Sequence, residues 1–303
     1  MKISILLYYK FVNIEKPYEI KLQQEEICKE LGLKGRILIA KEGINGSVSG
    51  SKEQTKSYIK FMNSHPLFGK TMFKEELSKE HPFKRFSAHV KKEIVRFEKP
   101  VNMKNTGAHL NPKEFLNILE KNKDIILIDA RNDYEYEVGH FKNAINPETE
   151  TFTEFPDFVE KLKGNENKKI LMYCTGGIRC EKASAYMKEQ GFKDVNQLKG
   201  GVLNFCKQFP NTAWKGKLFV FDKRLISDVN QSGEIITSCS YCKKDYDQYR
   251  NCKNSLCDKL IIQCKSCQED MNKCCSEACK EIHEKHLREK QIANQGKHRI
   301  PIN

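Results

Sequence analysis

The first third of the chain alternates between two spacings of apolar residues, one typical of strands and one typical of helices. Residues 3–12 read as a strand, and apolar residues at helical spacing follow from Pro17 until Gly32 ends the pattern. The further predicted elements are strands at 36–40 and 46–49, a helix at 52–64, and strands at 72–77 and 88–97. This order predicts a ferredoxin-like α+β domain over residues 1–98.

Residues 99–107 carry Pro, Asn and Gly with little apolar content, which is typical of a linker. Helices and short apolar strands alternate after it. The predicted elements are a helix from Asn111 or Pro112 to Leu119, a strand at 125–129, a helix at 155–162, a strand at 170–173 and a helix at 181–190. This alternation predicts an α/β domain with a parallel sheet over residues 108–221, and such sheets bind ligands at the carboxyl ends of their strands.

One cysteine lies where the last predicted strand becomes a loop. Cys174 follows the strand at 170–173, and Arg179 stands five positions later. The residues between them are Thr175, Gly176, Gly177 and Ile178. A loop that turns into a helix points backbone N–H groups inward and adds the positive end of the helix dipole, so a thiol held there ionises more easily. We therefore predict that Cys174 and Arg179 are the catalytic residues, Cys174 as the nucleophile and Arg179 as its cation, with the four loop residues as their cradle.

Other interpretations of these sulfurs stay open. A cysteine at the end of a strand is often only a small buried hydrophobic residue. A loop of cysteine and arginine serves both sulfur carriage and phosphate ester hydrolysis, but the loop here is one residue shorter than that of cysteine phosphatases and suits a persulfide better than a phosphate. Cys180 either resolves an oxidised or persulfidated Cys174 through a disulfide or packs at the start of the helix.

Nine of the thirteen cysteines lie between Cys239 and Cys279. Two C-x-x-C pairs are interleaved with two other pairs, and each pair can supply half of a tetrahedral thiolate site. The pairs are Cys239 with Cys242, Cys252 with Cys257, Cys264 with Cys267, and Cys275 with Cys279. Two zinc ions would fit, either cross-braced, with alternate pairs sharing an ion, or in sequential pairs. Cys274 and His283 are substitute ligands, and an iron–sulfur cluster is the alternative group. We predict a small cysteine-rich, metal-binding tail over residues 232–303 that folds with its metal.

Charge and targeting signals bear on partner and compartment. The chain has 53 Lys and Arg residues against 40 Asp and Glu, a net charge of +13, which favours a polyanionic partner such as nucleic acid. Residues 280–299 form a basic, helix-like run that reads as a solvated helix, with an RNA-binding arm as the alternative. The sequence shows neither a signal peptide nor a membrane span, so we expect a cytoplasmic protein whose cysteines are thiols or metal ligands. The oligomeric state stays open.

The loop from Cys174 to Arg179 resembles the active-site loop of rhodanese sulfurtransferases, and residues 125–147 and 198–205 resemble the segments that open and close that domain. A wider resemblance covers nearly all of residues 1–220. The stretches 35–50 and 82–95 carry it, and its most specific parts are residues 41–46, 131–135 and 174–180. With these stretches the chain resembles the bacterial rhodanese-domain tRNA uridine hydroxylases.

That resemblance implies an enzyme that uses molecular oxygen to hydroxylate carbon 5 of the wobble uridine of tRNA, with the cysteine matching Cys174 required. The sequence contains neither a flavin fingerprint nor a recognisable two-histidine, one-carboxylate iron site, so the electron donor is left open. Two alternatives from other classes remain. One is a sulfurtransferase that carries a persulfide on Cys174, and the other is a non-catalytic, zinc-stabilised adaptor that binds RNA.

Overall fold

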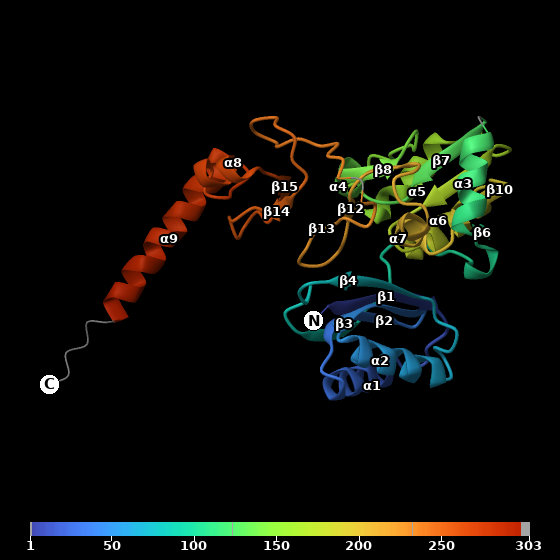
Figure 1. The fold of residues 1–303 in the computed structure, drawn as a ribbon, viewed down its shortest axis with the longest axis horizontal. Coiled ribbons are helices and arrows are strands. Elements are labelled where there is room, and N and C mark those ends of the chain that lie inside the picture. Colours follow the sequence, from blue (N-terminus) through green and yellow to red (C-terminus); the bar gives the residue numbers. More distant parts are fainter. Residues whose placement is uncertain (1, 123, 232, 298–303) are drawn as a thin grey trace. The chain divides into compact units, whose positions relative to one another are not determined.

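The computed structural model describes residues 2–122, 124–231 and 233–297 (Figure 1). Residues 1, 123, 232 and 298–303 lie outside this description, and they include the end of the predicted tail and of its basic run. The chain divides into two compact units, one up to Gly233 and one from Glu234. Within the described residues, no helix is both long enough and apolar enough to cross a membrane.

The first part of unit one is a five-stranded sheet with the order β4-β1-β3-β2-β5. Neighbouring strands are antiparallel except β2 and β5, which run parallel. Two helices, α1 and α2, lie against one face (Figure 1). The elements are β1 Ile3–Phe11, α1 Pro17–Glu30, β2 Lys34–Ala40, β3 Gly43–Gly50, α2 Lys52–Ser64, β4 Phe73–Ser78 and β5 Phe86–Val90.

Strand β1 contributes to two cores because its side chains alternate between the faces of the sheet. Leu6 and Tyr8 are buried in the core under the two helices. Leu7 points the other way and packs against the core of the domain that follows. The N-terminal sheet is therefore covered by its own helices on one face and meets the second domain with the other.

The second part of unit one contains a four-stranded parallel sheet with the order β6-β10-β9-β7. Helices α3 and α7 contribute to the core on one face, and α5 and α6 contribute to the core on the other. The elements are η1 Met103–Asn105, β6 Ala108–Leu110, α3 Pro112–Lys121, β7 Ile125–Asp129, α4 Asp133–Val138, β8 Gly139–Phe141, η2 Phe152–Glu154, α5 Phe155–Lys161, β9 Lys169–Tyr173, α6 Ile178–Glu189, β10 Asp194–Leu198 and α7 Gly201–Gln208. Short pairs follow, β11 Trp214–Gly216 with β8 and β12 Leu218–Phe219 with β13 Ile226–Ser227.

Unit two is small and has few regular elements. A two-stranded antiparallel sheet joins β14 Tyr249–Asn251 to β15 Leu260–Ile262. Helix α8 spans Lys265–Asp270 and the long helix α9 spans Glu277–Lys297. One buried cluster consists of Cys239, Cys264 and Cys267 with two tyrosines packed against them. The large apolar residues buried in this unit are few, namely Tyr249, Ile261, Ile262 and Met271.

The predicted fold class is confirmed: a ferredoxin-like α+β domain, an α/β domain with a parallel sheet, and a cysteine-rich tail. Most predicted element boundaries shift by one to three residues, and two of the differences bear on the site. The strand predicted at 88–97 is β5 at Phe86–Val90, and beyond it the Ile94 N–H donates to the Glu42 carboxylate rather than to a neighbouring strand. Helix α6 begins at Ile178 rather than at 181, so Arg179 and Cys180 are helical.

Candidate functional site

Cys174 lies at the carboxyl end of the central strand β9, on the face that α5 and α6 cover. Ile170 and Met172 share this face, as expected for alternate positions of a strand, and all three side chains belong to one core cluster. The Cys174 carbonyl accepts a hydrogen bond from the Val202 N–H, at the start of α7, with a length of 3.0 Å. The Cys174 side chain has no exposed surface.

The surroundings of the Cys174 sulfur favour a thiolate. Burial raises its pKa, but the hydrogen bond from the Cys180 thiol, the charge of Arg179 and the backbone N–H groups of Cys180 and Gly177 together lower it to about 5. The Gly177 N–H lies 3.1 Å from the sulfur, and Gly177 is the residue that precedes α6. The first turn of a helix concentrates such donors, so the loop stabilises a negative charge on this sulfur at neutral pH.

Cys180 lies next to Cys174 and acts as its hydrogen-bond donor. Burial and the neighbouring Cys174 sulfur both raise the pKa of Cys180 well above its usual value, so Cys180 keeps its proton. Its side chain also packs in the core cluster under α6. The sequence left open whether Cys180 packs at the start of the helix or forms a disulfide with Cys174. The two sulfurs are adjacent, and their surroundings favour an ionised Cys174 and a protonated Cys180.

Arg179 is turned toward a carboxylate. Its guanidinium forms a bidentate ion pair with Glu135 from α4, in which Nη2 lies 2.7 Å from Oε1. The same Nη2 lies 3.3 Å from the Thr175 hydroxyl. Glu135 is completely buried, and although burial raises its pKa, the charge and hydrogen bonds of Arg179 bring it below the usual value. Thr175 also donates to Glu135 at 3.0 Å. Arg179 thus anchors the loop to α4 and places its charge near Cys174.

The N-terminal domain closes over the loop. At Gly176, a Cβ atom would lie 3.0 Å from Leu7 Cδ2, and at Gly177, whose φ is +105°, it would lie 2.8 Å from the Tyr9 hydroxyl. Glycine is required at Gly177 both for this left-handed backbone conformation and for the close approach of Tyr9. Strand β1 is the cover that leaves Cys174 without exposed surface.

A buried lysine in α6 fixes the two domains together. Lys182 Nζ lies 2.9 Å from the Glu42 carboxylate and 2.6 Å from that of Glu93, both from the N-terminal domain, and it donates to the Val95 carbonyl at 3.1 Å. Asn45 donates to the Ile94 carbonyl at 2.9 Å, which ties the two N-terminal segments to each other. The stretches 35–50 and 82–95 that carried the wider resemblance therefore form this contact.

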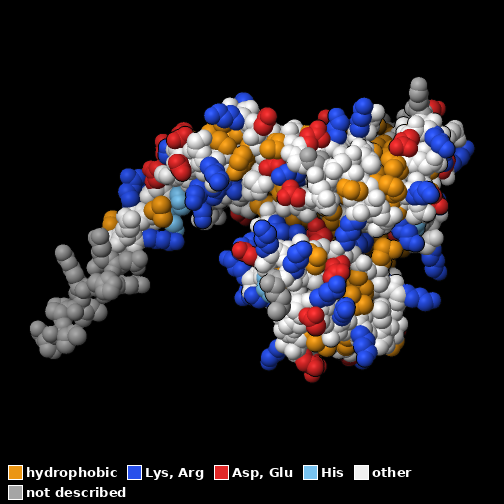
Figure 2. All heavy atoms as spheres, viewed as in Figure 1, with side chains coloured by type: hydrophobic (Ala, Val, Ile, Leu, Met, Phe, Trp, Pro, Cys, Tyr) orange, Lys and Arg blue, Asp and Glu red, His pale blue; other side chains and the backbone are white. Residues whose placement is uncertain are grey.

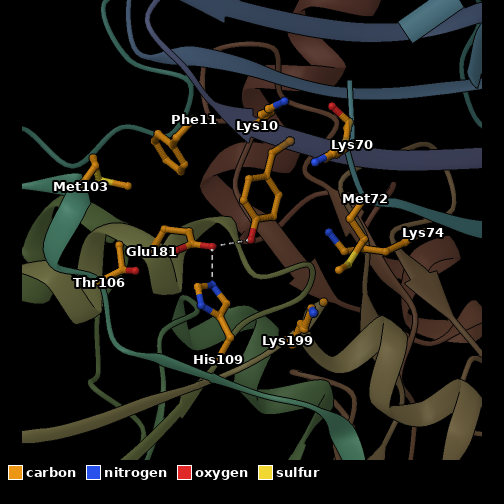
Figure 3. Close-up of a pocket in the computed structure, with 13 residues that line it drawn as sticks. Lys10, Phe11, Lys70, Met72, Lys74, Met103, Thr106, His109, Glu181 and Lys199 are labelled. Atoms are coloured by element: carbon orange, nitrogen blue, oxygen red, sulfur yellow. Dashed lines mark hydrogen bonds and ion pairs between the residues drawn. The ribbon is translucent and has the colours of Figure 1, made fainter. Parts of the chain in front are cut away.

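A pocket of about 450 Å³ opens beside the loop, between β1 and β4 of the first domain and α6 of the second (Figure 3). Glu181 organises its wall: Oε1 accepts from the Tyr9 hydroxyl at 2.9 Å and lies 2.9 Å from His109 Nε2, while Oε2 accepts from Gln197 at 3.1 Å. Lys74 also lines it. Burial raises the pKa of Glu181, but the hydrogen bonds from His109, Tyr9 and Gln197 bring it below its usual value, so this wall carries a carboxylate.

The eight paired cysteines of the tail form two groups of four, in the cross-braced arrangement. Within each group the sulfurs lie within 4.8 Å of one another. The first group is Cys239, Cys242, Cys264 and Cys267, and the second is Cys252, Cys257, Cys275 and Cys279. Adjacent sulfurs lie 3.5 to 3.6 Å apart, close to the ~3.8 Å edge of a thiolate tetrahedron around zinc. Cys274 and His283 belong to neither group.

Backbone N–H groups support both cysteine groups. The Cys264 N–H donates to the Cys239 sulfur and the Cys275 N–H donates to the Cys252 sulfur, each at 3.4 Å. Hydrogen bonds of this kind orient thiolate ligands and stabilise their charge. The donor set and its spacing are compatible with one zinc ion in each group.

Positive charge is spread over the surface. In the visible face of the molecule, Lys and Arg side chains are distributed over both units and interspersed with acidic residues (Figure 2). The net charge of +13 therefore does not gather in one patch on this face. The lysines around the pocket beside Cys174 are a more specific feature than the overall charge.

Comparison with known families divides the chain into three matched segments. Residues 3–94 match the UPF0176 acylphosphatase like domain, residues 111–208 match the rhodanese-like domain, and residues 215–280 match the rhodanase C-terminal model. The fold and the Cys174 loop thus define a rhodanese-domain protein with an additional domain on either side.

Curated relatives match almost the whole chain. A tRNA uridine(34) hydroxylase of Bacillus mycoides is 41% identical over 95% of this chain and 94% of its own, and that of Cytophaga hutchinsonii is 42% identical over 91% and 89%. This chain belongs to the tRNA uridine(34) hydroxylase family. Among solved structures, a rhodanese-like domain protein from Staphylococcus aureus matches 32% of this chain and 90% of its own, with 26% identity and a TM-score of 0.29.

Sequence reasoning found the loop but missed the groups around it. Glu135 lies in one of the stretches that carried the resemblance, yet nothing in the sequence pairs it with Arg179. Tyr9 and Lys74 lie in ordinary strands of another domain. A one-dimensional pattern shows periodicity and spacing, whereas these contacts depend on how two domains dock.

Proposed function

We propose that this protein hydroxylates carbon 5 of the uridine at position 34 of tRNA, with molecular oxygen as co-substrate and Cys174 as the reacting residue. One observation carries the proposal. A cysteine whose pKa lies at about 5 occupies the rhodanese loop of a chain that is 41% identical, over 95% of its length, to a tRNA uridine(34) hydroxylase. A tRNA substrate supports a cytoplasmic location, which we propose as well.

The chemistry follows from the thiolate. A sulfur anion at Cys174 adds to carbon 6 of the uracil ring, which makes carbon 5 electron-rich enough to react with oxygen. One oxygen atom stays on carbon 5, the other leaves as water with two electrons and two protons from an external reductant, and loss of the carbon 5 proton expels the Cys174 thiolate. Arg179 is a positioning residue, because its guanidinium is held by Glu135 and acts on the loop and on the charge of Cys174. Residues 175–178 supply the cradle of the loop, and the Gly177 N–H holds the sulfur. The wobble base lies in a single-stranded loop of tRNA, so only local unstacking is needed to present it.

Nucleoside analysis tests the proposal. A strain that lacks the gene should lose 5-hydroxyuridine derivatives from its tRNA, wild-type protein should restore them only when oxygen is supplied, and Cys174→Ser should not restore them. Cys28→Ala is the matched control, since Cys28 is a buried cysteine in α1 of the N-terminal domain. Unchanged nucleosides in the deletion strain, together with a persulfide on Cys174, would instead identify a sulfurtransferase. Full restoration by Cys174→Ser, together with loss of RNA binding when the tail cysteines are replaced, would identify a non-catalytic RNA-binding adaptor.

We also propose that the tail holds two structural zinc ions, one in each group of four cysteines. Four thiolates complete a tetrahedral shell around zinc, and a closed shell of this kind stabilises a fold rather than activating a water molecule. Because unit two buries a cluster of cysteines and few large apolar residues, metal binding supplies much of the free energy that folds it.

A further inference from the structure

The pocket beside the Cys174 loop is built from both domains of unit one and is rich in lysine. Its volume is about 450 Å³, and four of its lining residues are Lys10, Lys70, Lys74 and Lys199. These four lysines lie around the pocket in Figure 3. Tyr9 belongs to the same wall and adds an aromatic ring. A nucleotide-binding site typically combines cations, which attract the phosphate, with an aromatic ring, on which the base stacks.

Lys74 differs from the other three because it is buried, with only 6% of its surface exposed. In the β1–β4 pair it stands opposite Leu7, so both side chains point to the face that covers the rhodanese loop. Its ammonium lies 4.6 Å from the centre of the Tyr9 ring and 3.9 Å from the position that a Cβ of Gly176 would take. The N-terminal domain thus places a cation against the loop that holds Cys174.

In the part of the chain that the structure describes, this cation has no direct ionic partner. Within residues 2–122, 124–231 and 233–297, Lys74 Nζ forms no hydrogen bond or ion pair, and its ammonium lies over the Tyr9 ring. A buried cation normally has a carboxylate or several acceptors around it, because the lost hydration must be replaced. An unpaired ammonium in the wall of a pocket therefore indicates that a ligand group completes its surroundings.

We infer, on the basis of the proposed function, that this pocket receives the target uridine and that Lys74 contacts the carbonyl oxygen on which charge develops when Cys174 attacks the ring. In that step the sulfur lone pair forms the bond to carbon 6. The electron pair of the C5–C6 double bond moves into the conjugated carbonyl and leaves an enolate oxygen, O4. Lys74 donates an N–H to this oxygen. The step breaks only a π bond and needs no oxidant.

Tyr9 must move for this contact to occur. Cys174 has no exposed surface, and the Tyr9 hydroxyl lies against Gly177 while donating to Glu181. The base reaches the sulfur when this side chain leaves Glu181. The displaced ring stays in the pocket wall, where it can stack on the base that replaces it.

The charge of Lys74 gives the proposal a second, independent signature. Burial lowers its pKa to about 8, although Cys174 at the end of β9 and Glu181 on α6 act to raise it. The other groups that face it are Tyr9 from β1 and, across the pocket, Lys10, Lys70, His109 and Lys199. Lysine in this position loses its proton above about pH 8, whereas arginine would remain charged.

A trapping experiment on the full-length protein tests the inference without any electron donor. The probe is an anticodon stem–loop RNA with 5-fluorouridine at position 34, which activates carbon 6 toward a thiolate, and the readout is the rate of covalent adduct formation on Cys174. We expect Lys74→Met to slow adduct formation about a hundredfold, as when one oxyanion donor is lost. Lys74→Arg should keep most of the rate and remove the decline above pH 8 that wild type shows. Lys56→Met, a charge loss on the exposed side of α2, should match wild type.

The outcomes separate this inference from the proposed function. If wild-type protein forms no adduct and restores no hydroxylated uridine, the proposed function fails. If wild type reacts and Lys74→Met reacts at a similar rate, the role of Lys74 is wrong. If Lys74→Met and Lys74→Arg slow adduct formation equally, Lys74 has only a structural role, and this result would also overturn the inference.

Discussion

Replacing Lys74 by methionine should make the protein more stable while it impairs the reaction. Lys74 is buried, and its pKa falls from 10.5 to about 8 because burial disfavours the charged form. One pKa unit corresponds to about 1.4 kcal/mol, so holding this group protonated at pH 7 costs the folded state about 3 kcal/mol. Methionine keeps most of the apolar stem of lysine and removes this cost.

The sign of the pH dependence follows from proton binding. Below about pH 8 Lys74 is protonated in both the folded and unfolded states, and the folded state bears the full cost. Between about pH 8 and 10.5 the unfolded chain binds more protons than the folded one, so wild-type stability rises with pH. The advantage of Lys74→Met should therefore be about 3 kcal/mol at pH 7 and should vanish near pH 10.5.

Urea unfolding of the full-length, zinc-loaded protein measures this difference. The chain contains a single tryptophan, and Trp214 is buried in unit one, so its fluorescence reports the unit that contains Lys74. Circular dichroism should follow the same transition. Lys56→Met controls for the loss of one surface charge. A Lys74→Met protein that is less stable than wild type at pH 7, or whose advantage does not shrink between pH 8 and 10, would refute the reasoning.

Two further predictions concern the sulfurs. Cys180→Ala should raise the pKa of Cys174 above about 5, because a hydrogen bond to the thiolate is lost. Absorbance at 240 nm reports the thiolate, and the difference between a protein and its Cys174→Ser derivative isolates Cys174. This difference should appear at higher pH in the Cys180→Ala protein than in wild type, and equal midpoints would contradict the hydrogen bond. Metal analysis should find about two zinc ions per wild-type chain. The double variant Cys242→Ser, Cys264→Ser should lose one ion, whereas Cys242→Ser, Cys257→Ser should lose both; the reverse result would support sequential pairing.

Much of the fold follows from local signals in the sequence. Helix α2 begins with a capping box formed by Ser51 and Gln54, and its apolar spacing predicts the same limits that the structure shows. Strand β9 reads as buried because it is apolar without alternation, as expected for a central parallel strand. Signals that act over three or four residues are visible in one dimension, so these elements could be predicted.

The surroundings of the site could not be predicted in the same way. The Glu135 carboxylate is 44 residues from Arg179 along the chain, and Lys182 meets Glu42 and Glu93 only because two domains dock. The early start of α6 was missed as well, because Gly177 reads as part of a loop until its left-handed conformation is seen to precede the helix. Long-range ionic contacts leave no periodic trace in the sequence.

The division of the reacting groups between two domains explains why the N-terminal domain belongs to the site. The rhodanese domain supplies the sulfur and the N–H groups that ionise it, but its own cation, Arg179, is already paired with Glu135. A second negative charge, arising on the substrate, needs another cation. Lys74 lies beside the same loop and has no ion-pair partner among the described residues. Lys182 holds the domain that carries Lys74 against α6. The charge of Lys74 costs the free folded protein about 3 kcal/mol. In the inferred mechanism this cost is offset when the substrate becomes an anion, so the interaction favours the reacting complex over the free protein.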